Sequence, residues 1–298
     1  MQKTTHPGIR EFSVAGAEEG PYGIAAGPDD ALWLTFAQSG EIARLTLDGQ
    51  VSRYSAGSAS CRPTVITRGP DGALWFARSD GHIGRITTGG ELTEFALPDL
   101  AANPFGICAG PDGAMWFTEM STDRIGRITV HGDISHFALP VAGAFPSFIT
   151  PGPDGALWFT LNQADAIGRI DLDGEVALHS LPGGTAPVGI TCGSDGALWF
   201  VGIAAGKVGR LEVDGTLREF PLAAPGAKPH AITAAPSGDC WFTQWGANRV
   251  GRITPDGHIA EYDLPTAGSE PHGIAIGPDG AAWTALEIGS VARITHDH

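Results

Sequence analysis

Two histidines that each follow a proline directly are the residues of this sequence best suited to chemistry. His230 stands in AKPHAITAAPSGDCWFTQW and His272 in SEPHGIAIGPDGAAWTALE, and only the second stretch also carries glutamates, Glu270 and Glu287, around its histidine. Paired carboxylates suit a hard divalent cation such as Mg²⁺, and a histidine titrates close enough to neutral pH to take or give a proton. The four residues could therefore perform metal-assisted acid–base chemistry, or they could form a wet, polar channel rim without a catalytic role.

The two stretches are copies of a repeat that occurs seven times. Three markers recur in register every 41 or 42 residues: a Pro-x-x-Ile element, a tryptophan, and an arginine in a mostly Ile/Val-Gly-Arg-Ile/Leu context. The prolines are Pro21, Pro63, Pro104, Pro146, Pro187, Pro229 and Pro271. The tryptophans are Trp33, Trp75, Trp116, Trp158, Trp199, Trp241 and Trp283, and the arginines are Arg44, Arg85, Arg127, Arg169, Arg210, Arg252 and Arg293. Because these residues recur in every copy, we expect them to be architectural, with the tryptophans packed between repeats and each arginine paired near its own turn.

Each copy consists of short runs rich in Ile, Phe, Trp, Thr and Val, separated by turn sequences such as Gly-Pro-Asp-Gly. Four short strands in a unit of this length are typical of a β-propeller blade. The sequence therefore predicts an all-β, seven-bladed β-propeller with four antiparallel strands per blade, as a single domain over residues 1–298. The last copy supplies no fourth strand after residues 290–295, so we expect residues 8–14 to complete it and close the ring.

The blade geometry predicts where the variable residues of the repeat lie. The first strand of a blade is the innermost, and the second runs antiparallel to it, so the start of the first and the end of the second lie on the same face. Glu270, His272 and Glu287 should therefore converge near the central channel, with His230 of the neighbouring blade beside them. Tyr22, at the same position in the first copy, would also be close.

Composition excludes several classes of function. The formal net charge of −15 disfavours nucleic acid and anionic membranes as partners, and turn aspartates account for much of this charge. The four cysteines lie in different repeats without metal or disulfide spacing. The N-terminal stretch lacks an apolar targeting segment and no segment resembles a membrane span, so we expect a soluble, cytoplasmic protein and, since no repeat is left uncapped, a monomer.

The remaining histidines are not expected to act in a site. Five of them fall in turns or outer strands and are interpreted as ordinary surface residues: His82, His131, His136, His179 and His258. His296 and His298 belong to an expected frayed terminus.

The chain resembles the streptogramin B lyases, also called virginiamycin B lyases, over nearly its whole length. The resemblance lies in GPYGI at residues 20–24, ALWFT at 156–160, KPHAIT at 228–233, WGANRVGRIT at 245–254 and EPHGI at 270–274. Its specific part is the combination of PHAI in the sixth copy, EPHGI in the seventh and the glutamate after the last tryptophan.

This resemblance implies a Mg²⁺-dependent elimination that linearises cyclic depsipeptide lactones, the type B streptogramin antibiotics. Glu270 and Glu287 would bind Mg²⁺, directly or through water, and His272 would be the catalytic proton acceptor. His230 would contact the substrate, and Tyr22 would line the substrate cleft or serve in packing. The base would remove the proton beside a carbonyl, the metal would stabilise the developing enolate, and the ester carboxylate would leave.

Two alternatives stay open at this point. A propeller-type metal-dependent lactonase would hydrolyse its ester, but such sites draw ligands from several blades, whereas Arg78 and Glu119 are isolated from the candidate residues here. A non-catalytic binding propeller would use the same rim as an interaction surface.

The seventh copy departs from the family pattern at one position. It reads WTALE, whereas phenylalanine is more usual after the tryptophan, and this predicts that the local wall of the site differs.

Overall fold

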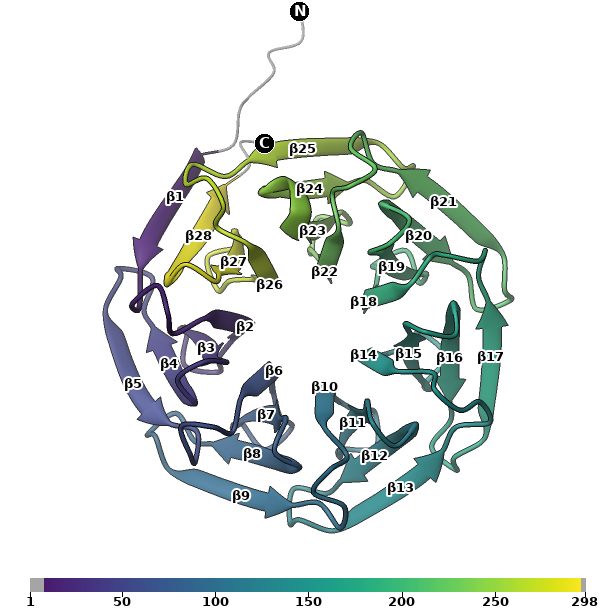
Figure 1. Cartoon of the computed structure of the whole chain (residues 1–298), viewed down its shortest axis with the longest axis horizontal. Coiled ribbons are helices and arrows are strands. Elements are labelled where there is room, and N and C mark those ends of the chain that lie inside the picture. The colour runs from purple at the N-terminus through teal and green to yellow at the C-terminus, as the bar shows by residue number, and fades with distance from the viewer. Residues whose placement is uncertain (1–7, 296–298) are drawn as a thin grey trace, which may run out of the picture.

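The computed structural model describes residues 8–295 as seven four-stranded antiparallel sheets arranged in a ring, a seven-bladed β-propeller (Figure 1). Blade 1 consists of β2 (Pro21–Ala26), β3 (Leu32–Phe36), β4 (Glu41–Leu45) and β5 (Val51–Ser55). Blade 2 consists of β6 (Pro63–Arg68), β7 (Leu74–Arg78), β8 (His82–Ile86) and β9 (Leu92–Ala96). Blade 3 consists of β10 (Pro104–Ala109), β11 (Met115–Glu119), β12 (Arg124–Ile128) and β13 (Ile134–Ala138).

The second half of the ring repeats this plan. Blade 4 consists of β14 (Pro146–Pro151), β15 (Leu157–Leu161), β16 (Ala166–Ile170) and β17 (Val176–Ser180). Blade 5 consists of β18 (Pro187–Cys192), β19 (Leu198–Gly202), β20 (Lys207–Leu211) and β21 (Leu217–Pro221). Blade 6 consists of β22 (Pro229–Ala234), β23 (Cys240–Gln244), β24 (Arg249–Ile253) and β25 (Ile259–Asp263), with a short 3₁₀ helix η1 (Trp245–Ala247) after β23.

Blade 7 is assembled from both ends of the described chain. It contains β26 (Pro271–Ile276), β27 (Ala282–Leu286) and β28 (Ser290–Thr295), and its outer strand is β1 (Gly8–Ser13). β1 pairs antiparallel with β28 from Gly8 opposite Thr295 to Ser13 opposite Ser290. The predicted propeller and its closure by an N-terminal strand are therefore confirmed, whereas the expected fraying at His296 and His298 lies outside the described residues.

The first strand of every blade faces the central channel, and the fourth forms the perimeter of the ring (Figure 1). Each innermost strand packs against the innermost strands of both neighbouring blades, including β2 against β26 at the closure. None of the described residues forms a helix with the length and hydropathy needed to span a bilayer.

The seven repeated tryptophans form the core between blades. All seven are at most 5% exposed, and they cluster with second-strand residues of the next blade, as Trp75 does with Met115 and Phe117. Each also stacks on a ring of its own outer strand, with ring centroids between 5.1 Å for Trp158–His179 and 6.0 Å for Trp241–Tyr262. The expected packing between repeats is confirmed.

The turn aspartates fasten each tryptophan to the repeated arginine. In blade 2, Asp71 accepts a 3.0 Å hydrogen bond from the indole of Trp75 and a 2.6 Å bond from Nε of Arg85. The same three-residue clasp occurs at Asp29, Asp112, Asp154, Asp195 and Asp279. Blade 6 differs, because Ser237 takes the aspartate position and Asp239 holds Arg252 instead. The aspartates in the turns that precede the second strands are thus structural ion pairs in six blades.

A second recurring contact joins the second and third strands. In five blades the phenylalanine that follows the tryptophan lies directly over the glycine of the Gly-Arg motif. Phe117, for example, lies over Gly126, and a Cβ atom added to Gly126 would be only 2.1 Å from the phenylalanine ring. Blade 1 pairs the smaller Leu34 with Ala43, and blade 7 pairs Thr284 with Ala292. The threonine of WTALE is therefore a buried core residue matched by a larger partner, not a different wall of the cleft as the sequence suggested.

Candidate active site

One rim of the channel is built from the residue before each proline and the residue after each second strand. The residue before the proline has left-handed backbone in all seven blades, with φ between 45° and 63°, at Gly20, Arg62, Asn103, Phe145, Ala186, Lys228 and Glu270. Its carbonyl accepts a hydrogen bond from the backbone of the residue after the second strand, which in blade 7 runs from Glu287 N to Glu270 O at 3.3 Å. Only in blade 7 are both members of this pair carboxylates.

His272 is aimed at these glutamates by a bulge in β26. The register of β26 against β27 shifts between Pro271 and Ile274, so that two residues of β26 oppose one of β27. The same bulge occurs in the first strand of all seven blades, and it sets the direction in which the residue after each proline points. The His272 carbonyl is also fixed from blade 6, because Thr243 Oγ1 donates a 2.9 Å hydrogen bond to it.

Glu270, His272 and Glu287 converge as the sequence predicted. One ligand atom from each lies within 4.8 Å of the others, and among residues 8–295 they form the one cluster of three or more such groups that could hold a metal ion. His272 Nε2 is 2.9 Å from Glu287 Oε2, and His272 is 9% exposed. The carboxylate oxygens fit a hard cation such as Mg²⁺, which prefers oxygen ligands and retains several waters.

The surroundings of Glu287 stabilise its ionised form. The hydrogen bond from His272 lowers the pKa of the Glu287 carboxyl; burial opposes this, while the His272 charge and bonds with Glu270 and Gln38 add to it. Gln38 belongs to blade 1, so the carboxylate is held across the closure of the ring. Glu287 is therefore an anion over the whole physiological range of pH.

The imidazole of His272 lies between two aromatic rings. The ring centroid of Tyr22 is 4.7 Å from that of His272, and the indole of Trp245 stacks on the other side at 6.4 Å. The ammonium of Lys228 in turn lies 4.5 Å over the Trp245 ring. These contacts fix the orientation of the imidazole plane toward Glu287.

Tyr22 and His230 form a neutral polar pair beside His272. The Tyr22 hydroxyl is 3.2 Å from His230 Nε2, and the rings of His230 and His272 are 5.0 Å apart. Burial, with the His272 charge adding to it, lowers the pKa of His230 to about 3. Burial and the Glu287 charge raise the pKa of Tyr22. At neutral pH both are uncharged, so they offer hydrogen bonds and not ions.

Two cavities meet at this aromatic layer. An outer cleft of about 330 Å³ is lined by Tyr22, His272 and Glu287 together with residues of blades 1–3. An inner channel cavity of about 330 Å³, lined largely by aliphatic residues of the first strands, also reaches Tyr22 and His230. Tyr22 borders both, so the candidate residues stand where the open cleft at the rim adjoins the channel cavity.

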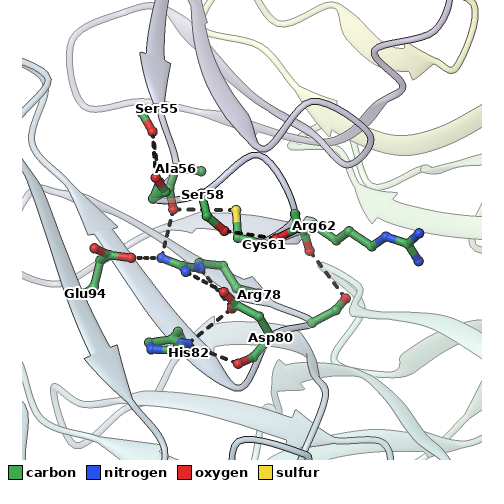
Figure 2. Close-up of polar contacts among 12 residues, drawn as sticks. Ser55, Ala56, Ser58, Cys61, Arg62, Arg78, Asp80, His82 and Glu94 are labelled. Atoms are coloured by element: carbon green, nitrogen blue, oxygen red, sulfur yellow. Dashed lines mark hydrogen bonds and ion pairs between the residues drawn. The ribbon is translucent and has the colours of Figure 1, made fainter.

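Arg78 and Glu119 lie outside this cluster, each paired in its own blade. Figure 2 shows the guanidinium of Arg78 surrounded by Asp80, Glu94 and the Ala56 carbonyl, and its side chain is 3% exposed. Glu119 is buried with one carboxylate oxygen 2.8 Å from His136 Nδ1. Neither is available as a ligand to a cation at blade 7.

The interpretation of three histidines as ordinary surface residues was wrong. His82 is the half-buried first residue of the third strand β8, and its Nδ1 lies 3.1 Å from the Asp80 carbonyl. His136 faces the buried Glu119 across its blade. His179 stacks on Trp158 at the position where the other blades place tyrosine or phenylalanine. His136 and His179 are both half-buried structural residues. Their outer strands cover other parts of the same blade: His179 covers the tryptophan, and His136 covers the end of the second strand.

Sequence reasoning missed Trp245, Gln38 and Lys228 as neighbours of the site. Trp245 follows the second strand of blade 6 and is thus the counterpart of Glu287, and Lys228 is the counterpart of Glu270. The signal was present in the variable positions of the sixth repeat. Gln38 lies one residue beyond such a position, and only the closure of the ring brings it to Glu287.

A comparison with protein families gives a match over nearly the whole chain. A family model described as the virginiamycin B lyase family matches residues 7–294. Among curated proteins, virginiamycin B lyase of Mycolicibacterium smegmatis is 51% identical over 50 residues, which is 17% of this chain and 17% of that protein. The corresponding protein of Bordetella pertussis is 49% identical over 56 residues, 19% of each chain. These matched stretches span less than a fifth of either relative.

Solved structures are similar over the whole ring. A streptogramin B lyase structure superposes with a TM-score of 0.96 at 39% identity and covers 100% of both chains. Virginiamycin B lyase from Staphylococcus aureus gives a TM-score of 0.94 at 41% identity, covering 98% of this chain and 100% of that one. A catalytically inactive histidine-to-alanine variant of the Staphylococcus aureus protein, crystallised with quinupristin, gives the same values.

Proposed function

Because this chain belongs to the virginiamycin B lyase family, we propose that it is a Mg²⁺-dependent lyase that linearises cyclic depsipeptide lactones of the type B streptogramin class. The observation that carries the proposal is the convergence of Glu270, His272 and Glu287 on one rim of the channel. That cluster combines a proton acceptor with two carboxylates beside an open cleft. The complex of the Staphylococcus aureus relative with quinupristin supports the substrate class.

In the proposed reaction the His272 imidazole, which has the Glu287 carboxylate beside it, accepts the α-proton of the residue whose β-carbon carries the ester oxygen. The electron pair of the C–H bond forms a carbon–carbon double bond, the β-carbon–oxygen bond breaks, and the ester leaves as a carboxylate. Glu287 stabilises the imidazolium that results. No water is consumed, so the linear product has the mass of the substrate.

Glu270 and Glu287 would hold the cation. When bound, it supplies positive charge that stabilises the negative charge developing on the substrate carbonyl. Tyr22 would contact the substrate directly, because it lines the cleft together with His272 and Glu287. His230 would contact the substrate through the neighbouring channel cavity, which it lines together with Tyr22. The stacked rings of Tyr22 and Trp245 keep the imidazole from rotating away.

The chemistry of the cleft favours elimination over a serine hydrolase reaction. Ser79 lines the cleft, but its hydroxyl lies 3.4 Å from the Arg62 carbonyl and has no base beside it among the described residues. A metal-dependent lactonase is the second candidate, since a cation at the same carboxylates could activate water. It is less well supported because the acidic candidate ligands all come from blade 7.

The test is to incubate the protein with quinupristin in Mg²⁺ or in EDTA and to weigh the product by mass spectrometry. We expect a linear product of unchanged mass that forms with Mg²⁺ and not with EDTA. A product heavier by one water would show hydrolysis and would favour the metal-dependent lactonase. Unchanged substrate, with no binding of Mg²⁺ in calorimetry, would favour a non-catalytic binding propeller.

The role of His272 is tested in the same assay. His272→Ala should lower the rate of ring opening by about 10²-fold or more, the range expected for loss of general acid–base catalysis. His258→Ala, which removes an exposed histidine from a turn of blade 6, is the matched control and should leave the rate unchanged. Full activity of His272→Ala would contradict the proposed mechanism.

A further inference from the structure

The cleft beside His272 extends over blades 1–3, and its wall is made of the variable positions of the repeat. After-proline residues contribute Tyr22, Thr64 and Phe105, and residues that follow second strands contribute Ser79 and Met120. Before-proline positions add Arg62 and Asn103. The scaffold is constant from blade to blade, so the character of the cleft is set by these few side chains.

Arg62 is the cation of this wall, and its guanidinium is free. No hydrogen bond, ion pair or ring contact joins the Arg62 side chain to any residue in the described range 8–295, and the residue is exposed. Figure 2 shows the guanidinium extending away from the neighbouring Arg78 cluster. Lys228, at the same position in blade 6, is instead placed over Trp245.

The backbone of Arg62 is nevertheless firmly held. Its φ of 45° is left-handed, its successor is the first proline of β6, and its carbonyl accepts a 3.2 Å hydrogen bond from Ser79 N. A left-handed residue next to a proline has little conformational freedom. The Arg62 side chain therefore starts from a fixed backbone position. It lines the same cleft as His272 and Glu287.

We propose that Arg62 is a substrate-binding residue that anchors the depsipeptide ring through its carbonyl oxygens at the blade 2 side of the cleft. This inference rests on the proposed function. A guanidinium presents several N–H donors in a fixed fork, which suits two neighbouring oxygen acceptors better than a lysine does. A cyclic depsipeptide presents such acceptors in its amide and ester carbonyls, and the other charged groups at the cleft, around Glu270 and Glu287, would repel them. Anchoring at Arg62 therefore turns the ring so that its ester faces His272.

The inference is tested with Arg62→Gln and Arg68→Gln. These residues flank the two ends of β6, both are exposed, and neither has a side-chain partner among the described residues, so the variants remove the same charge from opposite ends of one strand. We expect Arg62→Gln to raise KM for quinupristin at least five-fold with kcat changed less than two-fold, and Arg68→Gln to change neither. Arg62→Lys should recover only part of the affinity, because it restores charge without the fork.

Binding is measured separately from turnover in the His272→Ala background. Adding Arg62→Gln should weaken the Kd for quinupristin at least five-fold in calorimetry, while adding Arg68→Gln leaves it unchanged, with equal melting temperatures for both. If the wild-type protein opens quinupristin and Arg62→Gln behaves like Arg68→Gln, the role of Arg62 is overturned and the proposed function stands. If the wild-type protein neither opens nor binds quinupristin, the proposed function fails and the role of Arg62 fails with it.

Discussion

Glu287 has two roles at the candidate site, because it contacts His272 and also links blade 7 to blade 1. It follows the second strand of blade 7, contacts the imidazole of His272, and is held by Gln38 from blade 1. A carboxylate that accepts several hydrogen bonds remains ionised and fixed in orientation. Its position makes it both a candidate metal ligand and the group that orients the imidazole of His272.

Glu287→Gln preserves the shape of this side chain and removes its charge. We expect the affinity for Mg²⁺, measured by isothermal titration calorimetry, to fall about 10-fold or more, since changes even to groups that only support metal ligands cost about 10- to 100-fold. Glu91→Gln, at an exposed turn of blade 2, is the control. Unchanged Mg²⁺ affinity in Glu287→Gln would remove Glu287 from the ligand set.

At this scale the sequence predicted the meeting of Glu270, His272 and Glu287, because the strand order of a blade places the start of one strand beside the end of the next. It did not predict the aromatic sandwich of His272. Trp245 stands in a motif shared with the family, but its stacking depends on the distance between blades 6 and 7, which no spacing along the chain reveals. The contact between Gln38 and Glu287 could not be predicted either, because it joins blade 1 to blade 7 across the closure of the ring.

The clasp of aspartate, tryptophan and arginine is the element that repeats most regularly in the blades. Partial burial raises the pKa of Asp71, but hydrogen bonds from Trp75 and Arg85 outweigh it and leave that pKa below its ordinary value. Folding therefore favours the ionised carboxylate. Its contribution to stability is complete above the pKa of the unfolded chain, about 3.9, and is lost as the pH falls through the lower folded pKa.

Asp71→Asn should lower the melting temperature at pH 7 and have a smaller effect as the pH falls below about 4. Loss of the charged hydrogen bond to Arg85 is expected to cost about 1–3 kcal/mol, or a few degrees in melting temperature. Thermal unfolding followed by circular dichroism from pH 7 to pH 3 measures the difference. Asp263→Asn, which breaks an exposed pair with Arg249, should have almost no effect at any pH; a constant gap for Asp71→Asn across this range would contradict the argument.

The match between phenylalanine and glycine on neighbouring strands is a second property of the elements. Gly126→Ala places a methyl group 2.1 Å from the ring of Phe117, so we expect a loss of about 1–3 kcal/mol from overpacking. Phe117→Leu combined with Gly126→Ala reproduces the Leu34–Ala43 pair of blade 1 and should recover most of that loss. Urea denaturation of the four proteins in a double-mutant cycle measures the coupling, and additive effects would show that the two positions are independent.

The elements are largely predictable from the sequence because the repeat displays each of them seven times. Turn residues, alternating strands and the three markers together define one blade, and each copy supports the same assignment. The exchange of phenylalanine for threonine in blade 7 gave a wrong prediction, because its compensation by Ala292 lies on another strand and only the pairing shows it.

For the molecule as a whole, the closing strand β1 is the feature on which the ring depends. It supplies all of the pairing along the outer edge of β28 and places Phe12 against Trp283 with ring centroids 5.4 Å apart. Removing it would leave β28 as an open edge and expose the face of an otherwise buried tryptophan. Unpaired edges of this kind promote association between chains.

A chain that lacks residues 1–13 should melt about 10 °C or more below the full chain, as expected from the loss of a packed aromatic ring and six paired residues. It should also associate, which size-exclusion chromatography with light scattering detects. A chain that lacks only residues 1–6 keeps β1 and is the control. A synthetic peptide of residues 8–15 added in excess should restore part of the melting temperature, and an unchanged melting temperature on truncation would show that β1 is dispensable.

The closure also bears on when the candidate site can form during biosynthesis. β1 is translated before every other described strand, whereas β28, its partner in blade 7, is translated after all of them. The carboxylates and the imidazole of the site belong to that same blade. A nascent chain interrupted anywhere in the first six blades therefore lacks Glu270, His272 and Glu287, so the proposed site forms only after most of blade 7 has been translated.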